Sequence, residues 1–323
     1  MRVFKLNIPP YEYWPFWLFY APVVPLWLWY AVRSKSSTYF CKVNPGIEFG
    51  GFLDYSKHQI LAQVPQEFEP NTLFISHKDE CHEKPNFPFV VKPDVGERGV
   101  NVEIIRSFQD WKNYPIKENL ILQNYIDWPL EFGVFYVRKP NEEKGSILSI
   151  TGKEFLVFEG NGLQTLKEFV VENPRARQRE NYLKEKFKNQ WETVLPKGKQ
   201  LFLEPIGNHN RGTRFYDASD LKTTELIEKI DAIAQQINGF YYGRFDVKAV
   251  SIEEFQQGKF MVLEVNGANS EPTHIYDENF NLWQAYREVG RHLKHQFDIA
   301  KFHPKTHRAS LFYQAIFRRL IRN

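Results

Sequence analysis

The sequence predicts an α+β fold, in which antiparallel strands pack against amphipathic helices. Two strands are expected at 243–248 and 260–266, because apolar residues alternate with other residues along both. The polar connection at 251–258 is short enough to join them as an antiparallel pair. Helices are expected over 221–238 and 282–297, where apolar residues recur at helical spacing. In the first helix these residues are Leu226, Ile230, Ile233 and Ile237.

Composition and charge are those of a globular protein. At 323 residues the chain is long enough for two domains, or for three that pack closely. It is 42% hydrophobic and 25% charged, and its net charge of +3 is only mildly basic. This charge suits small anionic substrates and predicts no nucleic-acid partner. Cys41 and Cys81 are too few for a disulfide framework or a zinc site, so we expect a reducing, cytoplasmic compartment.

The expected strand pair brings four polar side chains to one face. Successive side chains on a strand point to opposite faces, so Arg244 and Asp246 share a face with Glu264 and Asn266. Carboxylate and amide oxygens suit Mg²⁺, which proteins usually hold with one or two carboxylates plus substrate phosphates. A surface ion pair between Arg244 and Asp246 is the simpler alternative. Three oxygen ligands beside one basic residue exceed what a solvated strand needs, so a metal site is favoured.

A phosphate-binding segment is expected upstream of this pair. The apolar strand at 87–93 contains Lys92 near its end, and a loop with Gly96 and Gly99 follows at 94–100. A lysine brings a point charge to phosphate oxygens, and a glycine loop lets backbone N–H groups approach them. A turn with two glycines after a strand is common, so this signal is weak when it stands alone.

A third segment links the two, with strands expected at 120–126 and 131–137. The ordered set of motifs resembles the ATP-grasp superfamily, and within it carboxylate–amine ligases such as D-alanine–D-alanine ligase and the ATP-grasp part of cyanophycin synthetase. The resemblance covers about residues 87–276. It rests on Lys92-Pro93 with the glycine loop, Gln123 to Ile126, Glu131, Arg244-Phe245-Asp246 and Glu264-Val265-Asn266.

The resemblance implies an ATP-grasp fold, in which two α+β subdomains clamp ATP, and a nucleotide site. Lys92 would contact the α- and β-phosphates, and the loop with Gly96 and Gly99 would close over the β- and γ-phosphates. Glu131 would bind the ribose hydroxyls. The segment that hydrogen-bonds adenine would be Gln123, Asn124, Tyr125 and Ile126.

The resemblance also implies a metal site and catalytic arginines. Asp246, Glu264 and Asn266 would hold Mg²⁺, with Mn²⁺ as an alternative, and Arg244 would stabilise the acyl phosphate and the tetrahedral state that follows. The segment 207–214 resembles a loop that reaches the phosphates and the substrate, and in it Arg211 is the second catalytic candidate. A solvated basic loop is the alternative interpretation of that segment.

The predicted domain organisation has three parts: an atypical N-terminal region at 1–86, an ATP-grasp domain at 87–299 and a basic tail at 300–323. The N-terminal region is short for the Rossmann-like domain that opens related ligases. Residues 13–32 carry no charge and mix aromatic residues with three prolines. Three interpretations stay open: a buried aromatic face, an interfacial membrane contact or apolar substrate channel, and a membrane span.

The tail at 300–323 is basic and has no acidic residue. Its apolar residues can line one side of a helix, which is typical both of a helix that lies on anionic lipid and of a docked terminal helix. Together with the aromatic stretch, it predicts a peripheral membrane contact.

Several further assignments are weaker. The second phosphate-binding lysine of the family could be Lys78 or Lys84, neither of which lies in a clear pattern. His77, Cys81 and His82 favour a polar loop over a zinc site, because no fourth ligand is near. The acyl and amine pocket is expected to be built from residues 1–86, Arg211, Arg214 and the segment 267–274. Within it, His274 is expected to be a hydrogen-bonded structural histidine, with assistance to proton transfer as the alternative.

Three functions fit these observations. The first is an ATP-dependent ligase that joins a carboxylate to an amine through an acyl phosphate and releases ADP and phosphate. The second is an ATP-grasp kinase that phosphorylates a hydroxyl. The third is a nucleotide-binding scaffold at a membrane surface that performs no turnover. The complete set of Asp246, Glu264 and Asn266 favours an enzyme, and its small-molecule substrates are not readable from the sequence.

Overall fold

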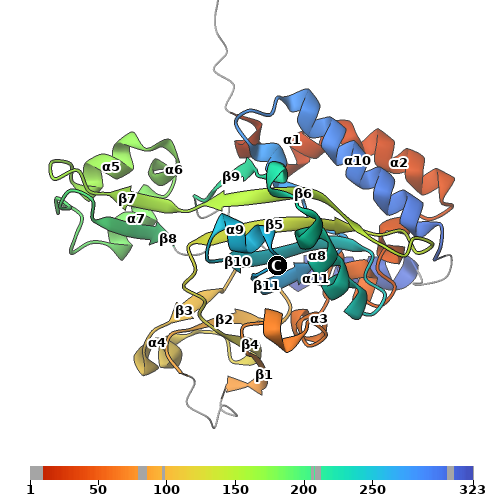
Figure 1. Cartoon of the computed structure of the whole chain (residues 1–323), viewed down its shortest axis with the longest axis horizontal. Coiled ribbons are helices and arrows are strands. Elements are labelled where there is room, and N and C mark those ends of the chain that lie inside the picture. Colours follow the sequence, from red (N-terminus) through yellow and green to blue (C-terminus); the bar gives the residue numbers. More distant parts are fainter. Residues whose placement is uncertain are drawn as a thin grey trace, which may run out of the picture.

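The computed structural model describes residues 10–78, 86–96, 99–204, 207, 212–303 and 309–322. Within them the chain forms antiparallel sheets of four, five and two strands, with helices packed around them (Figure 1). The predicted α+β class is therefore confirmed.

The five-stranded sheet lies at the centre of the molecule, in the order β11-β10-β5-β6-β9. Its middle strands are β10 (Tyr242–Ala249) and β5 (Leu130–Val137), and β11 (Met261–Asn266) lies at one edge. On the other side β6 (Ser146–Glu154) pairs with β9 (Arg214–Asp217). The predicted strand pair is thus correct in both pairing and direction.

The four-stranded sheet is the smaller second layer, in the order β1-β4-β2-β3. It contains β1 (Thr72–His77), β4 (Glu118–Asn124), β2 (Phe89–Pro93) and β3 (Glu103–Ile105), and the short helix α4 (Phe108–Asn113) packs beside it. The domain boundary predicted at residue 86 falls between β1 and β2, so this sheet takes strands from both sides of that boundary.

The main hydrophobic core fills one face of the five-stranded sheet. Helices α3 (Lys57–Leu61), α8 (Thr224–Gln236) and α9 (Ile252–Gln256) contribute to it. Helix α8 begins where the Thr223 hydroxyl accepts a hydrogen bond from the backbone N–H of Leu226, an ordinary N-cap. Its predicted apolar face is confirmed, since these residues are all buried in this core: Leu226, Ile230, Ile233 and Ile237.

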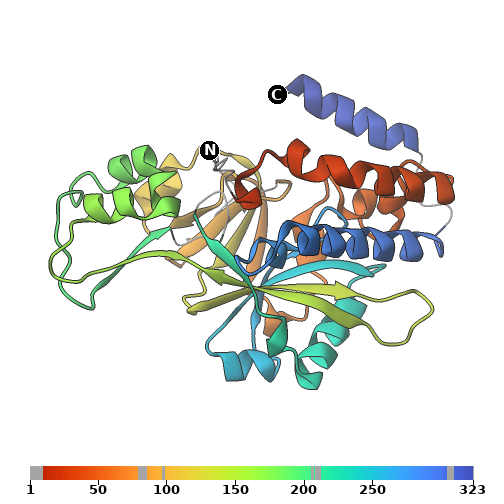
Figure 2. The ribbon, with the colours of Figure 1, turned by 90° about the horizontal axis from the view of Figure 1, so that it is seen from above.

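The other face is covered by α10 (Leu282–Ala300), against which the aromatic N-terminal stretch packs (Figure 2). That stretch is broken into α1 (Phe16–Tyr20), a 3₁₀ turn and α2 (Val24–Arg33), as its prolines lead one to expect. Phe19 is only 2% exposed, whereas Trp17 is 70% exposed. The stretch therefore has a buried side and an exposed side. Among the described residues, no helix is long and apolar enough to cross a membrane.

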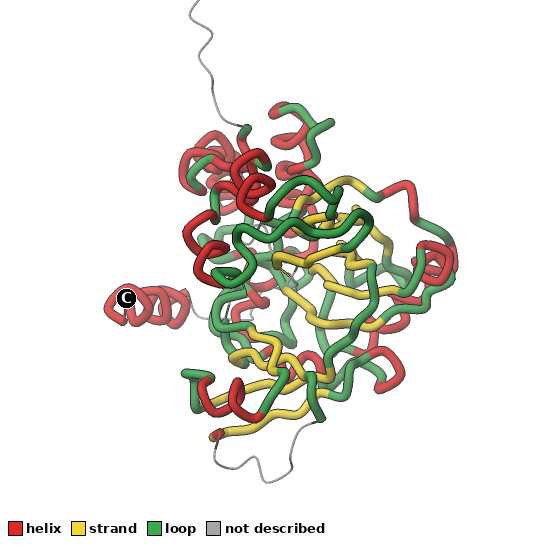
Figure 3. The backbone as a smooth tube through the Cα atoms, turned by 90° about the vertical axis from the view of Figure 1, so that its left-hand side faces the viewer, coloured by secondary structure: helices red, strands yellow, loops and turns green. Residues whose placement is uncertain are grey.

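The basic tail forms α11 (Ala309–Arg322), which stands at the margin of the molecule (Figure 3). Phe312 is 4% exposed and packs edge-on against the rings of Phe40 and Phe52. On the opposite side of the helix Phe317 is exposed. The helix is thus docked through one aromatic anchor and keeps an apolar outer side.

A small lobe projects from the central sheet with a hydrophobic core of its own (Figure 1). It consists of the two-stranded sheet β7 (Leu156–Glu159) and β8 (Gln200–Glu204) with three helices. These helices are α5 (Leu166–Glu172), α6 (Pro174–Arg177) and α7 (Glu180–Lys186). Residues 172–200, which are rich in Arg and Lys, lie mostly on this lobe.

Candidate active site

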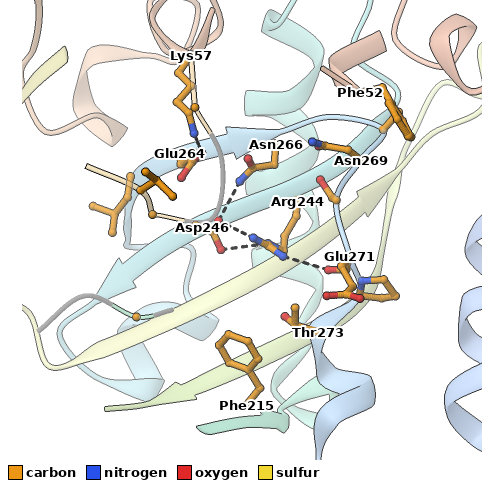
Figure 4. Close-up of a pocket in the computed structure, with 18 of the residues that line it drawn as sticks. Phe52, Lys57, Phe215, Arg244, Asp246, Glu264, Asn266, Asn269, Glu271 and Thr273 are labelled. Atoms are coloured by element: carbon orange, nitrogen blue, oxygen red, sulfur yellow. Dashed lines mark hydrogen bonds and ion pairs between the residues drawn. The ribbon is translucent and has the colours of Figure 1, made fainter. Parts of the chain in front are cut away.

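The four polar residues predicted to share a face do share it. Arg244 pairs with Asn266 and Asp246 with Glu264 across β10 and β11, and all four side chains line one cavity (Figure 4). The strand alternation that predicted this arrangement is therefore confirmed.

Asp246 is the centre of a buried polar network. It is 6% exposed and accepts hydrogen bonds from Arg244 Nε at 3.1 Å, Arg244 Nη2 at 3.0 Å, Lys153 Nζ at 3.0 Å and Asn266 Nδ2 at 3.0 Å. Burial alone would raise the pKa of Asp246, but Arg244 and Lys153 hold it well below its ordinary value. Asp246 is therefore an anion at neutral pH, as a metal ligand must be.

Lys153 on β6 is a site residue that the sequence reasoning missed. Its Nζ donates to Glu131 at 2.6 Å and to Asp246 at 3.0 Å. Although burial opposes the charged form, Asp246 and Glu131 raise the pKa of Lys153 above its ordinary value. The sequence gives only a weak indication of this role for Lys153. Lys153 lies opposite Glu131 because β6 pairs with β5, and the sequence does not indicate which strands are neighbours.

Lys78, one of the two candidates for a second phosphate-binding lysine, does not line the cavity. Its Nζ donates to the backbone oxygen of Tyr114 at 2.8 Å and lies 4.7 Å from the ring centroid of Trp111. The other candidate, Lys84, lies outside the described residues.

Two further lysines surround the strand pair. Lys92 is buried, and its Nζ donates to the backbone oxygen of Leu263 at 2.9 Å. Burial lowers the pKa of Lys92 to about 8, against the opposing effect of Glu264. Lys57 on α3 forms an ion pair with Glu264 (Figure 4). Sequence reasoning missed Lys57, because nothing in its local pattern indicates that α3 packs on β11.

The segment predicted to hold adenine lies along the same cavity, which Gln123, Asn124, Tyr125 and Ile126 all line. Lys248 fixes the end of this segment, because its Nζ donates to the backbone oxygens of Ile126 at 3.1 Å and Trp128 at 3.2 Å. Lys248 was missed as well. Strand alternation could have found it, since it follows Asp246 by two residues on the same strand.

The predicted phosphate loop is described in part. Gly96 and Gly99 both line the cavity, and Gly99 has a φ of +67°, a conformation that favours glycine. Residues 97 and 98 lie outside the described part of the chain. Arg211, Cys81 and His82 lie outside it too, so the structure places neither the second catalytic arginine nor the proposed polar loop.

The substrate side differs from prediction at Arg214. Its guanidinium pairs with Glu154 at 2.6 Å and with Glu278 at 3.0 Å, and the residue does not line the cavity. Arg214 is therefore not part of the described acyl and amine pocket. His274 is buried 3.8 Å from Glu288 and also lies off the cavity, as a structural histidine would.

The donor set on this face consists of oxygen atoms, which suits Mg²⁺ bound together with phosphate. Among the described residues, no three His, Cys, Asp or Glu side chains are grouped as a metal site. The face instead offers Asp246, Glu264 and the amide of Asn266. This is the sparse oxygen set with which proteins hold Mg²⁺ together with substrate phosphates.

No protein-family profile and no curated protein matches the chain. Solved structures that match include a bifunctional glutathione synthetase from Pasteurella multocida, with 14% identity, a TM-score of 0.40 and coverage of 74% of this chain and 35% of that one. D-alanine–D-alanine ligase from Bacillus anthracis matches with 14% identity, a TM-score of 0.40 and coverage of 77% and 66%. The ATP-grasp ligase PsnB, solved with Mg and ADP, matches with 12% identity, a TM-score of 0.40 and coverage of 75% and 58%.

These solved structures are similar to the chain over about three quarters of its length. The chain spans from 35% to 66% of the length of these three proteins, and its chemistry has to be argued from its own residues.

Proposed function

We propose that the protein is a cytoplasmic, ATP-dependent ligase that forms an amide bond between a carboxylate and an amine. One observation carries the proposal: Asp246, Glu264 and Asn266 share a face with Arg244, and buried lysines converge on it. Buried charges are costly to desolvate. These charged side chains therefore suit a charged ligand that binds together with its own cation.

The lysines are the expected phosphate ligands. Lys92 and Lys153 line the cavity beside the metal-ligand candidates, and both can donate to phosphate oxygens. Bound Mg²⁺ would neutralise phosphate charge, with Asp246, Glu264 and Asn266 as the residues that hold it. Because phosphoryl transfer depends mainly on positioning and charge neutralisation, this set provides what the first step needs.

Glu131 and the segment 123–126 are the expected nucleoside ligands. Glu131 is buried and held by Lys153, so its carboxylate is fixed in the cavity. The backbone of the segment is tied down at its far end by Lys248. Both features would position a nucleotide along the cavity, which is lined by residues of the four-stranded and the five-stranded sheet.

Arg244 is the expected catalytic arginine. Asp246 and other carboxylates raise its pKa although burial opposes this, so it stays a cation. Its Nη1 donates to the backbone oxygen of Glu271 at 3.0 Å, which fixes the guanidinium between the strand pair and the following loop. A fixed positive group suits a step in which negative charge develops on an acyl oxygen.

The reaction has two balanced steps. A substrate carboxylate oxygen attacks the γ-phosphorus of ATP, the bond to the β-phosphate oxygen breaks, and ADP leaves. The amine nitrogen then attacks the acyl carbon, the C–O bond to phosphate breaks, and inorganic phosphate leaves while the amine loses a proton. If a hydroxyl oxygen attacked the γ-phosphorus instead, the reaction would end with the phosphorylated hydroxyl compound and ADP. The enzyme would then be a kinase.

The test is release of ADP and phosphate from ATP and Mg²⁺ with panels of carboxylates and amines. Release that requires both substrates, and is absent in Asp246→Asn, is the expected result. Release of ADP without phosphate in the presence of a hydroxyl compound would replace the ligase by a kinase. ATP binding without turnover for any pair would favour the scaffold function.

A further inference from the structure

The aromatic N-terminal stretch forms a wall of the cavity that contains the candidate active site. The cavity has a volume of about 1130 Å³ and runs without interruption from Lys92 and Asp246 to residues of α1 and α2. Pockets for one drug-sized ligand hold roughly 300–1000 Å³. The cavity therefore has room for a second ligand beside a nucleotide. This ligand would lie at the end far from the residues that are expected to bind the nucleotide.

That far end is apolar. We call it the aromatic chamber, and we define it by side chains that come from the N-terminal region and α10. These are Trp14, Phe19, Val23, Trp27, Phe52 and Leu293. A concave apolar wall of this kind excludes water and favours a ligand with hydrocarbon surface.

The chamber wall is rigidly packed. The ring of Phe19 stacks on Tyr11 at 5.7 Å and on Tyr286 at 5.3 Å between centroids, so both neighbours restrain it. Phe19 and Val23 are buried together with Val289 of α10. These contacts restrain Phe19 and Val23 on the wall of the cavity.

The chamber is also tied to the reacting end. The hydroxyl of Tyr20, next to Phe19, donates to the carboxylate of Glu271, while the backbone oxygen of Glu271 accepts from Arg244. Gln296 lines the cavity too, and its amide is occupied by the backbone oxygen of Ala268 at 2.8 Å. Glu271 and Gln296 are thus hydrogen-bonded within the protein, and the guanidinium of Arg244 is linked to the chamber through Glu271 and Tyr20.

We propose that the aromatic chamber binds the hydrocarbon chain of a long-chain carboxylic acid, with the carboxylate directed to Arg244. This inference rests on the proposed ligase function, because it names the acyl substrate of that same site. Arg319 of α11 also lines the cavity. The proposal assigns the carboxylate to Arg244, since the carboxylate has to meet the nucleotide.

Chain length should control affinity. Each buried methylene is worth about 0.8 kcal/mol, which corresponds to about a fourfold change in Kd. Affinity should therefore rise steeply from butyrate to laurate and level off once the chamber is full. Methyl laurate, which lacks the charge, should bind at least tenfold more weakly than laurate.

The experiment measures laurate binding to the full-length protein by calorimetry below the micelle concentration, with ATP–Mg²⁺ binding measured on the same samples. Leu293→Glu places a carboxylate in the chamber. Leu28→Glu makes the same change on α2 at a side chain that is 49% exposed and lies outside the cavity lining. Leu293→Phe fills the chamber without adding charge and serves if the Glu variant does not fold.

The expected result is laurate binding that Leu293→Glu and Leu293→Phe weaken at least tenfold and that Leu28→Glu and Arg319→Gln leave within twofold. ATP affinity should be unchanged in the chamber variants. No laurate binding by a wild-type protein that binds ATP overturns the chamber proposal alone. Equal losses in Leu28→Glu and Leu293→Glu, or loss in Arg319→Gln, overturn it too. Laurate binding without ATP binding would retain the chamber and overturn the proposed function.

Discussion

The two ends of the cavity are built on opposite physical principles. At the strand pair, charged side chains are removed from water and satisfy one another, as Asp246 does with Arg244 and Lys153. At the aromatic chamber, rings such as Phe19 pack against rings and leave an unfilled apolar space. Changes at the first end should therefore affect chemistry, and changes at the second should affect stability and choice of substrate.

The largest expected effect is that of Asp246→Asn on turnover. The neutral amide cannot replace an anion between two cations and a metal, and removing a group that stabilises developing charge costs about 10²–10³ in rate. We expect about a 100- to 1000-fold loss of ADP release in a steady-state assay. Asp220→Asn, the same change at an exposed residue, is the control. Comparable losses in both variants would contradict the assignment.

Phe19→Ala, at the aromatic chamber, should lower the stability of the protein. Truncating a buried Phe costs about 3–5 kcal/mol, so the free energy of unfolding in urea should fall by about that amount. Trp17→Ala should change it by no more than about 0.5 kcal/mol, since Trp17 is 70% exposed. A similar small effect at both positions would mean that Phe19 does not anchor the stretch.

Lys153→Met tests the lysine that sequence reasoning missed. Loss of one partner of a buried charge pair costs roughly 2–5 kcal/mol, so ATP affinity in calorimetry should fall about 100-fold. Lys78→Met should leave ATP affinity within twofold, because Lys78 is bonded to Tyr114 elsewhere. If Lys78→Met weakens ATP binding more than Lys153→Met, the two lysines have been assigned in the wrong order.

His292 lies between the two ends and gives the protein an acid sensitivity. Burial holds its pKa well below the ordinary value, which is about 6.5 in an unfolded chain. Below that pH the unfolded state binds more protons than the native state, so stability falls as the pH falls. From pH 7 to pH 5 the free energy of unfolding should therefore fall, because protonation of this residue favours the unfolded state.

Urea titrations at the two pH values measure this loss. Neighbouring histidines also have a lowered pKa, so wild-type protein should lose somewhat more. His292→Gln should flatten the profile, and His303→Gln, at a less buried residue, should flatten it less. A profile unchanged in His292→Gln would show that another group carries the acid sensitivity.

The smallest expected effect concerns the outer side of the aromatic stretch. Trp17 and Trp29 are 70% and 57% exposed, and Trp favours the membrane–water interface. We expect salt-sensitive co-sedimentation with anionic vesicles, which Trp17→Ala with Trp29→Ala reduces severalfold. Trp283→Ala, at another exposed tryptophan, is the control. Absence of salt-sensitive binding by the wild-type protein would remove the predicted membrane contact.

Local patterns predicted most of the site residues that lie on the strand pair β10 and β11. Alternation along β10 and β11 was enough to put Arg244, Asp246 and Glu264 on one face, because side-chain direction follows from position in a strand. The same rule could have added Lys248. Helix α8 was predicted for the same kind of reason, since its apolar spacing is local.

What could not be predicted depends on contacts between distant segments. Lys153 reaches Glu131 only because β6 pairs with β5, and Lys57 reaches Glu264 only because α3 packs on β11. Arg214 was misassigned because ion pairs with Glu154 and Glu278 leave no sequence signal. The aromatic stretch stayed ambiguous because composition alone does not say which of its residues face inward.

The contacts that join the N-terminal region to the site have a consequence for biosynthesis. Tyr20 meets Glu271 across 251 residues of chain, and Lys57 meets Glu264 across 207. Chains emerge from the ribosome N-terminal end first, so the aromatic stretch is made long before α10, which covers it. Until then the side of the stretch that carries Phe19 has no α10 to pack against.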